Sequence, residues 1–367
     1  MVGRRHRTRK FSTVLAATPT LHLLHAGAIQ SSNMATSDPS VQLASDAPIS
    51  KAVDDTLGRV ALAQRLSEIV RAAPNKVSRT IGFVGRSGAG RTSTLALTKE
   101  ILDRRVDVTT HILDVEDYPN VAGLLGAMLD QLTEFFTTAG VVDKAHQIRD
   151  RVARYGNVIS SLAKVAGVSV DAGTLKRSPQ AVRAEIADVT QDVERRLVLA
   201  IDHVDLLGGA DLIALFKGTR QFATMPFVTL VFAFDRNVVA HRLATLSAGS
   251  HALLERAIMV ELELPPCDPM VFARVILGHI FAAGNRADRN VESLVPLFDP
   301  TSPTSVPCLS RIATMRDAKR FANSIVALMP LVADDGDLVN AVRTLAASFF
   351  AAPIAPAWDQ PATNVSL

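Results

Sequence analysis

The sequence predicts an α/β protein in which helices cover both faces of a parallel sheet, followed by a smaller helical domain. Uninterrupted apolar runs at residues 197–201 and 227–234 are typical of strands buried on both faces. Helical hydrophobic spacing recurs between the strand-like runs, and this alternation is characteristic of a parallel sheet. A third apolar run, at 80–84, leads directly into a cluster of glycines.

Hydrophobic spacing places each element in turn. Apolar residues recur every three or four positions from residue 57 to residue 73, and Pro74 ends this first helix. Ser178 and Asp268, each followed by proline, are typical helix starts. The predicted strands cover residues 80–84, 111–115, 197–201, 227–234 and 258–264. The predicted helices cover residues 57–73, 91–102, 124–136, 143–166, 180–195, 269–283, 290–298, 315–329 and 336–350, with a hairpin or loop at 168–174.

Composition divides the chain into four segments. Residues 1–50 are predicted to be a disordered basic leader and linker, and residues 351–367 a flexible, proline-rich tail. Residues 51–265 form the predicted α/β domain, and residues 266–350 form the helical domain. Two consecutive prolines lie at the boundary between these two domains.

The net charge of +3 comes from the N-terminal segment. Five of the 39 Lys and Arg residues and two of the 36 Asp and Glu residues lie within residues 1–50, so the rest of the chain carries equal numbers of both signs. A neutral body argues against a nucleic-acid-binding surface, and no nucleic-acid partner is expected. The leader is open to three interpretations: a disordered segment, a targeting segment, or residues upstream of a true start at Met34.

Cysteine count and hydropathy indicate the cellular setting in which this protein is expected. Cys267 and Cys308 are too few for a disulfide framework or a four-cysteine zinc site, which favours a reducing, cytoplasmic setting. The sequence contains no run of 18 strongly apolar residues, so no transmembrane span is expected.

Residues 81–93 read IGFVGRSGAGRTS and match the phosphate-loop pattern G-x-x-x-x-G-[K/R]-[ST]. Backbone N–H groups must curl around phosphate oxygens, which requires glycines at positive φ. The following helix directs its positive end at the same anion, and Thr92 is expected to place its hydroxyl on Mg²⁺. The alternative is a glycine-rich turn of another α/β fold. The predicted phosphate-binding residues are Gly85, Arg86, Ser87, Gly88, Ala89, Gly90, Arg91, Thr92 and Ser93.

Arg91 stands where the phosphate-loop pattern normally has lysine. Lysine is a compact point charge, whereas arginine is longer, planar and presents a fixed fork of donors. We therefore expect Arg91 to support nucleotide binding better than phosphoryl transfer.

The apolar strand LVLAIDHVD, residues 197–205, ends in acids. Asp202 lies at the carboxyl edge of the strand, where ligands bind in open α/β sheets, and is predicted to hold Mg²⁺ together with Thr92. The alternative is an aspartate that only caps a turn. Where an acid would normally polarise the attacking water, this sequence has His203, and Asp205 is the second candidate for that role.

Four motifs, in order along about 300 residues, resemble the KAP family of P-loop NTPases, which is related to AAA+ and STAND ATPases. They are a motif ahead of the glycine loop, a degenerate acidic run, a fourth-strand signature, and a helical-domain motif usually written Pro-Arg-Asp-x-Lys-Arg-x-x-Asn. In this sequence they occupy residues 55–59, 202–205, 231–239 and 315–323.

The resemblance implies a P-loop NTPase three-layer sandwich with a five-stranded parallel sheet of order 5-1-4-3-2 and a C-terminal helical lid domain. It also implies a sensor-like position for Asp235 as a nucleotide-binding residue. Arg316 becomes a candidate γ-phosphate sensor, with a solvated basic helix face as the alternative. Three departures leave the Walker A and Walker B motifs degenerate: Arg91 replaces a lysine, His203 an acid, and Leu206 an arginine.

The resulting hypothesis is a cytoplasmic, KAP-like protein that binds ATP and Mg²⁺ and uses nucleotide state as a conformational switch. Slow hydrolysis stays open, with Asp202, His203, Asp205 and Arg316 as the catalytic candidates. The alternative is a catalytically inactive pseudo-NTPase that acts as a scaffold for an unidentified protein partner. Oligomerisation also stays open.

Overall fold

A computed structural model describes residues 43–72, 78–138, 195–222, 226–245, 251–287 and 290–349. All of these residues belong to one compact unit, Pro39–Leu367. The predicted helix at 143–166, the hairpin or loop at 168–174, nearly all of the helix at 180–195, most of the leader and the C-terminal tail lie outside the described residues.

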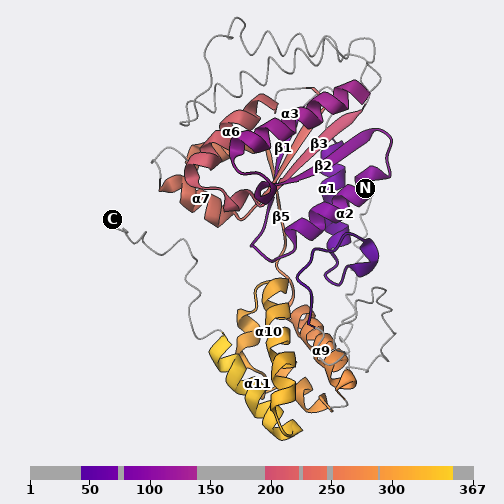
Figure 1. The fold of residues 1–367 in the computed structure, drawn as a ribbon, viewed down its shortest axis with the longest axis vertical. Coiled ribbons are helices and arrows are strands. Elements are labelled where there is room, and N and C mark those ends of the chain that lie inside the picture. The colour runs from indigo at the N-terminus through magenta and orange to yellow at the C-terminus, as the bar shows by residue number, and fades with distance from the viewer. Residues whose placement is uncertain are drawn as a thin grey trace, which may run out of the picture. The chain divides into compact units, whose positions relative to one another are not determined.

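Five parallel strands form the sheet (Figure 1). They are β1 (Arg79–Val84), β2 (Val108–Asp114), β3 (Arg196–Asp202), β4 (Val228–Phe234) and β5 (Val260–Glu263). Their order across the sheet is β2-β3-β4-β1-β5, which confirms the predicted order 5-1-4-3-2. Every neighbouring pair is parallel, so the carboxyl ends of all five strands lie along one edge.

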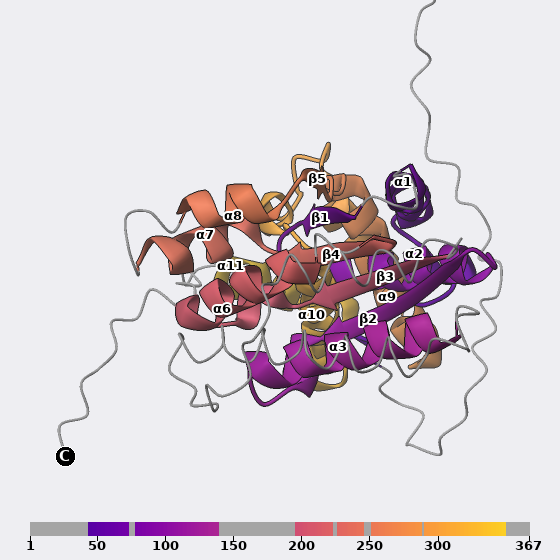
Figure 2. The same cartoon turned by 90° about the horizontal axis from the view of Figure 1, so that it is seen from above.

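Helices cover both faces of this sheet, and Figure 2 shows α1 and α3 on opposite sides of the strands. The helices around the sheet are α1 (Arg59–Arg71), α2 (Arg91–Asp103), α3 (Val121–Thr138), α6 (Gly209–Phe222), α7 (Arg236–Ala244) and α8 (His251–Ala257). Short 3₁₀ turns are η1 (Ala52–Asp54), η2 (Val115–Asp117) and η5 (Val204–Leu206).

Alternate residues of β3 divide between two hydrophobic cores. Leu197, Leu199 and Ile201 pack with side chains of α3, α6, α7 and α8, whereas Val198 and Ala200 pack with side chains of α1 and α2. Because successive side chains of a strand point to opposite faces, one uninterrupted apolar strand serves both cores. The result is the three-layer arrangement that the sequence predicts.

The C-terminal part of the chain is helical and has a core of its own. Its main helices are α9 (Pro269–Arg286), α10 (Met315–Leu328) and α11 (Asp335–Phe349), with 3₁₀ segments η6 (Glu292–Phe298), η7 (Pro307–Arg311) and η8 (Met329–Leu331). The helix expected at 290–298 is a 3₁₀ helix and not an α-helix, with Pro296 inside it. Proline lacks the N–H group that a longer helix would need at that position.

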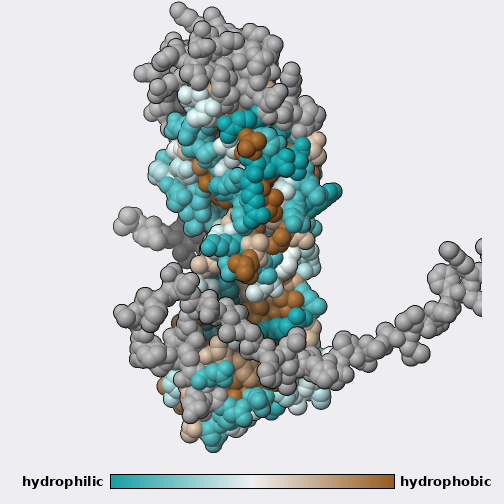
Figure 3. Space-filling view, turned by 90° about the vertical axis from the view of Figure 1, so that its right-hand side faces the viewer, coloured by the Kyte–Doolittle hydropathy of each residue, from teal (hydrophilic) through white to brown (hydrophobic). Residues whose placement is uncertain are grey.

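None of the described helices combines the length and the hydropathy needed to cross a membrane. On the face drawn in Figure 3, hydrophobic side chains are interspersed with hydrophilic ones over the described surface.

Candidate nucleotide-binding site

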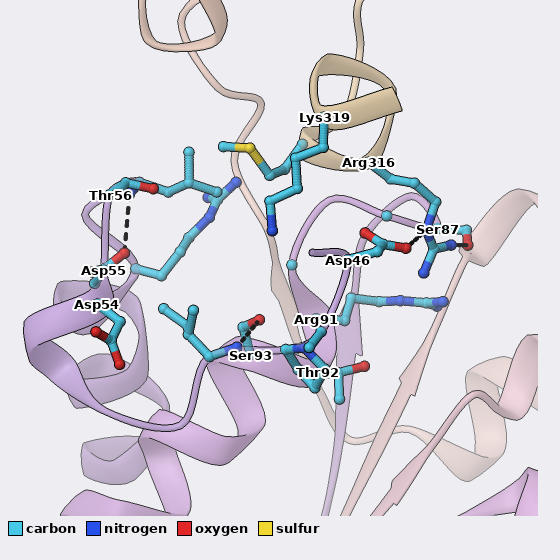
Figure 4. Close-up of a pocket in the computed structure, with 18 of the residues that line it drawn as sticks. Asp46, Asp54, Asp55, Thr56, Ser87, Arg91, Thr92, Ser93, Arg316 and Lys319 are labelled. Atoms are coloured by element: carbon cyan, nitrogen blue, oxygen red, sulfur yellow. Dashed lines mark hydrogen bonds and ion pairs between the residues drawn. The ribbon is translucent and has the colours of Figure 1, made fainter. Parts of the chain in front are cut away.

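A pocket of about 300 Å³ lies beside the glycine loop (Figure 4). Its walls come from six parts of the chain: residues 46–49, residues within 54–59, residues within 87–93, the end of β2, the residue that follows β3, and the start of α10. Because ligands of open α/β sheets bind outside the carboxyl ends of the strands, this is where a ligand is expected.

The glycine loop connects β1 to α2 and contains two residues in left-handed conformations. Gly88 has a φ of 77° and Gly90 a φ of 102°, which side chains rarely tolerate. Gly88 is also crowded, because a Cβ atom there would lie 2.8 Å from the Cβ of Arg316. The backbone around the start of α2 therefore depends on these glycines, as a phosphate loop requires.

The pocket collects most of the predicted site residues. It is lined by Ser87, Gly88, Gly90, Arg91, Thr92, Ser93, His203 and Arg316. Gly85, Arg86 and Ala89 line a second cavity, beside residues 263–267. Asp202 and Asp205 are buried and do not line the pocket surface.

Asp235 lies elsewhere. Its carboxylate accepts a hydrogen bond from the N–H of Asn237 at 3.0 Å and caps α7, and it does not line the pocket. The side chain of the neighbouring Arg236 forms an ion pair with Glu261.

Arg91 is buried in a two-pronged ion pair with Asp205. Its Nη1 lies 2.6 Å from Oδ1 and its Nη2 lies 3.0 Å from Oδ2. The two side chains are only 4% and 6% exposed. The guanidinium of the arginine in the lysine position is therefore paired with Asp205, the second candidate for orienting water.

Asp202 is a buried carboxylate at the end of β3. The residue is 1% exposed, and its Oδ1 accepts a hydrogen bond from the N–H of His203 at 2.8 Å. Its Oδ2 has no hydrogen-bond partner among the described residues. A buried carboxylate oxygen is costly unless something pairs with it. A divalent cation, or its bound water, at the end of β3 would satisfy this oxygen, so the residues fit the metal that the fold implies.

His203 bridges the ends of two strands. Its Nδ1 lies 2.9 Å from Oδ2 of Asp114, the last residue of β2, and its Nε2 lies 3.4 Å from Oγ1 of Thr92. Asp114 aligns with Asp202 in the sheet register, so both carboxylates reach the same edge. Sequence reasoning missed Asp114, although its place at the end of a predicted strand was the available signal.

α10 supplies two positive charges to the pocket. Nε of Arg316 lies 2.6 Å from Oδ2 of Asp46, and its Nη1 donates to Oγ of Ser87 at 3.2 Å (Figure 4). Lys319 lines the same pocket and donates from Nζ to the carbonyl of Ser45 at 2.6 Å. The predicted arginine sensor thus reaches the glycine loop, but in this structure a carboxylate occupies it.

Residues 43–49, predicted as part of a linker, make specific contacts. Asn323 of α10 exchanges two hydrogen bonds with the backbone of Ala44, at 2.6 and 3.0 Å. At the other end, the N–H of Ile49 donates to Oγ of Ser93 at 3.2 Å. We name residues 43–49 the strap, because they connect α10 to the start of α2.

Arg59 joins the region before the glycine loop to the region after β5. It is 4% exposed, and its guanidinium donates to the carbonyl of Pro265 at 3.0 Å and to that of Ala89 at 3.3 Å. It also contacts Sγ of Cys267 at 2.9 Å. Burial raises the pKa of the Cys267 thiol, while the charge of Arg59 acts in the opposite direction.

The fold and the glycine loop define the chain as a P-loop nucleotide-binding protein. The domain model described as KAP family P-loop domain matches residues 59–332. The chain belongs to the KAP family, as its motifs predict.

Individual relatives are distant. The chain is 24% identical over 267 residues to the phage T7 exclusion protein of Escherichia coli strain K12, a match that covers 60% of this chain and 34% of that protein. The chain therefore spans about a third of the length of this relative.

Two solved structures are also similar. A Walker-type ATPase of Pyrococcus abyssi is 12% identical, with a TM-score of 0.39 over 83% of this chain and 75% of that one. The ORC1 protein of Aeropyrum pernix, solved in complex with DNA, is 16% identical, with a TM-score of 0.38 over 79% of this chain and 66% of that one.

Proposed function

We propose that this chain binds ATP together with a divalent cation in the pocket between the glycine loop and α10. The observation that carries the proposal is the loop. Gly88 and Gly90 adopt the left-handed conformations that a phosphate cradle needs, at the N-terminus of α2. Membership of the KAP family supports the same function.

Positive groups on two sides of the pocket would bind the triphosphate. The backbone N–H groups of the loop and the positive end of α2 would hold phosphate oxygens from one side. Arg316 and Lys319 would neutralise charge from α10. Thr92 and Asp202 would hold the cation, which neutralises phosphate charge when bound.

Nucleotide state would act as a conformational switch through Arg316. A γ-phosphate that takes this guanidinium must displace the carboxylate of Asp46. Asp46 belongs to the strap, which Lys319 and Asn323 attach to α10. Exchange of one anion for another at Arg316 would therefore change how the strap and α10 hold the loop.

The pairing of Arg91 with Asp205 favours a second candidate, a nucleotide-binding scaffold without turnover. Both nitrogens of the fork are engaged, so neither Arg91 nor Asp205 is available to a phosphoryl group or to a water unless the buried pair breaks. A protein partner and a cytoplasmic location stay predictions for either candidate.

A binding titration with a fluorescent ATP analogue tests the proposal. Gly90→Ala is expected to weaken binding at least about tenfold, because alanine disfavours a φ of 102° although space for its Cβ exists. Gly126→Ala is the matched control: its Cβ also meets nothing within 4 Å, but the residue lies in α3. Equal affinity in wild type and Gly90→Ala would contradict the proposal.

Phosphate release then separates the two candidates. Turnover by wild type above that of Asp202→Asn indicates an ATPase. Saturable binding without turnover supports the scaffold, and a gain of turnover in Arg91→Lys would identify the buried arginine as the cause.

A further inference from the structure

His203 lies beside the hydroxyl group that the proposed cation would use. Its Nε2 is 3.4 Å from Oγ1 of Thr92, and both residues line the pocket. Two ligands on adjacent octahedral positions, each about 2.1 Å from a metal, lie about 3.0 Å apart. The separation of the two atoms is therefore close to that of neighbouring ligands of one cation.

Asp114 determines which nitrogen of His203 faces Thr92. Its two carboxylate oxygens lie 3.0 and 2.9 Å from Nδ1. A carboxylate accepts hydrogen bonds, so Nδ1 is the nitrogen that donates to Asp114, and Nε2 is the nitrogen left to offer a lone pair to a cation. Glu116 adds a second acid 4.0 Å from Nδ1. Metal-binding histidines have this arrangement, in which a carboxylate orients the ring and makes the other nitrogen a better ligand.

The backbone of His203 supports the same orientation. With a φ of 56°, His203 is one of two non-glycine residues at positive φ in the described part of the chain. Such a conformation is uncommon and is maintained where the surroundings require it. Here it sends the chain from β3 into η5 while the ring stays between Asp114 and Thr92.

We propose that Nε2 of His203 is a direct ligand of the nucleotide's cation, with Asp114 as the positioning residue. The inference rests on the proposed nucleotide binding of the same pocket. Imidazole is a preferred ligand of transition metals, whereas Mg²⁺ prefers oxygen ligands. The site therefore takes a divalent transition cation in preference to Mg²⁺, and Mn²⁺, the transition cation nearest to Mg²⁺ in its ligand preferences, serves as the probe. His203 stands where the family motif has an acid, and this replacement then changes which metal the site prefers.

The direct test is pulsed electron paramagnetic resonance of Mn²⁺ bound to the full chain with β,γ-methylene ATP. Wild type is expected to show nitrogen coupling to Mn²⁺, which changes to the ¹⁵N pattern in protein labelled with [¹⁵N]histidine. His203→Asn removes the coupling, and asparagine is suited to the left-handed backbone of this position. His111→Gln, on the same strand as Asp114, is the matched control and keeps the signal.

Metal titration gives the second measurement. Asp114→Asn is expected to weaken Mn²⁺ binding to the nucleotide complex about tenfold, because the second group that orients a ligand affects affinity on that scale. In His203→Asn, the ratio of Mn²⁺ affinity to Mg²⁺ affinity is expected to fall by at least about tenfold as well.

Two outcomes would overturn the inference. If wild type binds Mn²⁺ and nucleotide without histidine coupling, the inference fails and the proposed function stands. If wild type shows no saturable nucleotide binding with any cation, both fail.

Discussion

Two arginine–aspartate pairs flank the same pocket and differ in burial. Arg91 and Asp205, on the side of the glycine loop, have side chains that are 4% and 6% exposed. Arg316 and Asp46, on the side of α10, are 46% and 54% exposed. The two contacts are of similar length, with a nitrogen–oxygen distance of 2.6 Å in each.

Burial makes these similar contacts behave differently. Removing one member of a buried pair leaves an uncompensated charge in the interior, whereas an exposed pair exchanges readily with water and salt. We infer that the buried pair fixes the side of the pocket formed by the glycine loop. On the side of α10, a phosphate can replace the carboxylate of Asp46 at Arg316. One pocket then has one rigid and one adjustable wall.

The largest effect is expected for Asp205→Ala. It leaves Arg91 buried without its carboxylate, and the free energy of unfolding should fall by about 3–5 kcal/mol. Urea denaturation measures this loss. The control Asp103→Ala removes the exposed partner of Lys99 and should cost less than about 1 kcal/mol. A loss below that limit in Asp205→Ala would show that the buried pair is not the rigid element.

A smaller effect is expected for Asp46→Ala, on nucleotide affinity and not on stability. Removing the carboxylate leaves Arg316 to the γ-phosphate, so ATP should bind several-fold more tightly, while unfolding changes by less than about 1 kcal/mol. Titrations with ATP at 0.05 and 0.5 M NaCl measure the gain in ATP affinity and how far salt screens it.

Asp54→Ala is the control for this titration, because it removes another acid of the same pocket. Figure 4 draws Asp54 across the pocket from Asp46. An equal gain in Asp54→Ala would mean that general repulsion, and not occupancy of Arg316, limits binding.

The smallest effect concerns pH and involves His279 of α9. Burial lowers the pKa of this imidazole, and the charge of Lys319 lowers it further. A lowered pKa in the folded state means that the unfolded state binds the proton more readily. The resulting stability is present above the ordinary pKa of 6.5 and is lost as the pH falls.

His279→Gln should therefore reduce the loss of unfolding free energy between pH 7.5 and pH 5, measured by urea denaturation. An unchanged pH dependence would show that protonation of His279 does not affect the free energy of unfolding.

Sequence patterns predicted most of the fold. Apolar runs located the five strands, although β2 begins at Val108 and not at His111, because polar Thr109 and Thr110 concealed its start. No helix was specified at α6, α7 or α8, which cover one face of the sheet. The strand order came from the family motifs, since periodicity says nothing of which strands are neighbours.

The candidate site was predicted less evenly. The glycine loop was found because its function depends on a short local pattern. Asp114 was missed because a carboxylate at a strand end gains meaning only from the neighbouring strand, here through Asp202 and His203. The composition of the strap predicts only a linker, since its contacts with α10 leave no periodic pattern in its sequence.

By itself, the sequence determined the residues that depend on local chain geometry: the glycines at positive φ, the hydroxyl at Thr92 and the acid that ends β3. Tertiary structure decided which groups these residues meet. Arg91 lies 114 positions from Asp205, His203 lies 89 from Asp114, and Arg316 lies 270 from Asp46. Such pairs form through strand register and helix packing, and the free energy of an ion pair depends on the burial that packing provides.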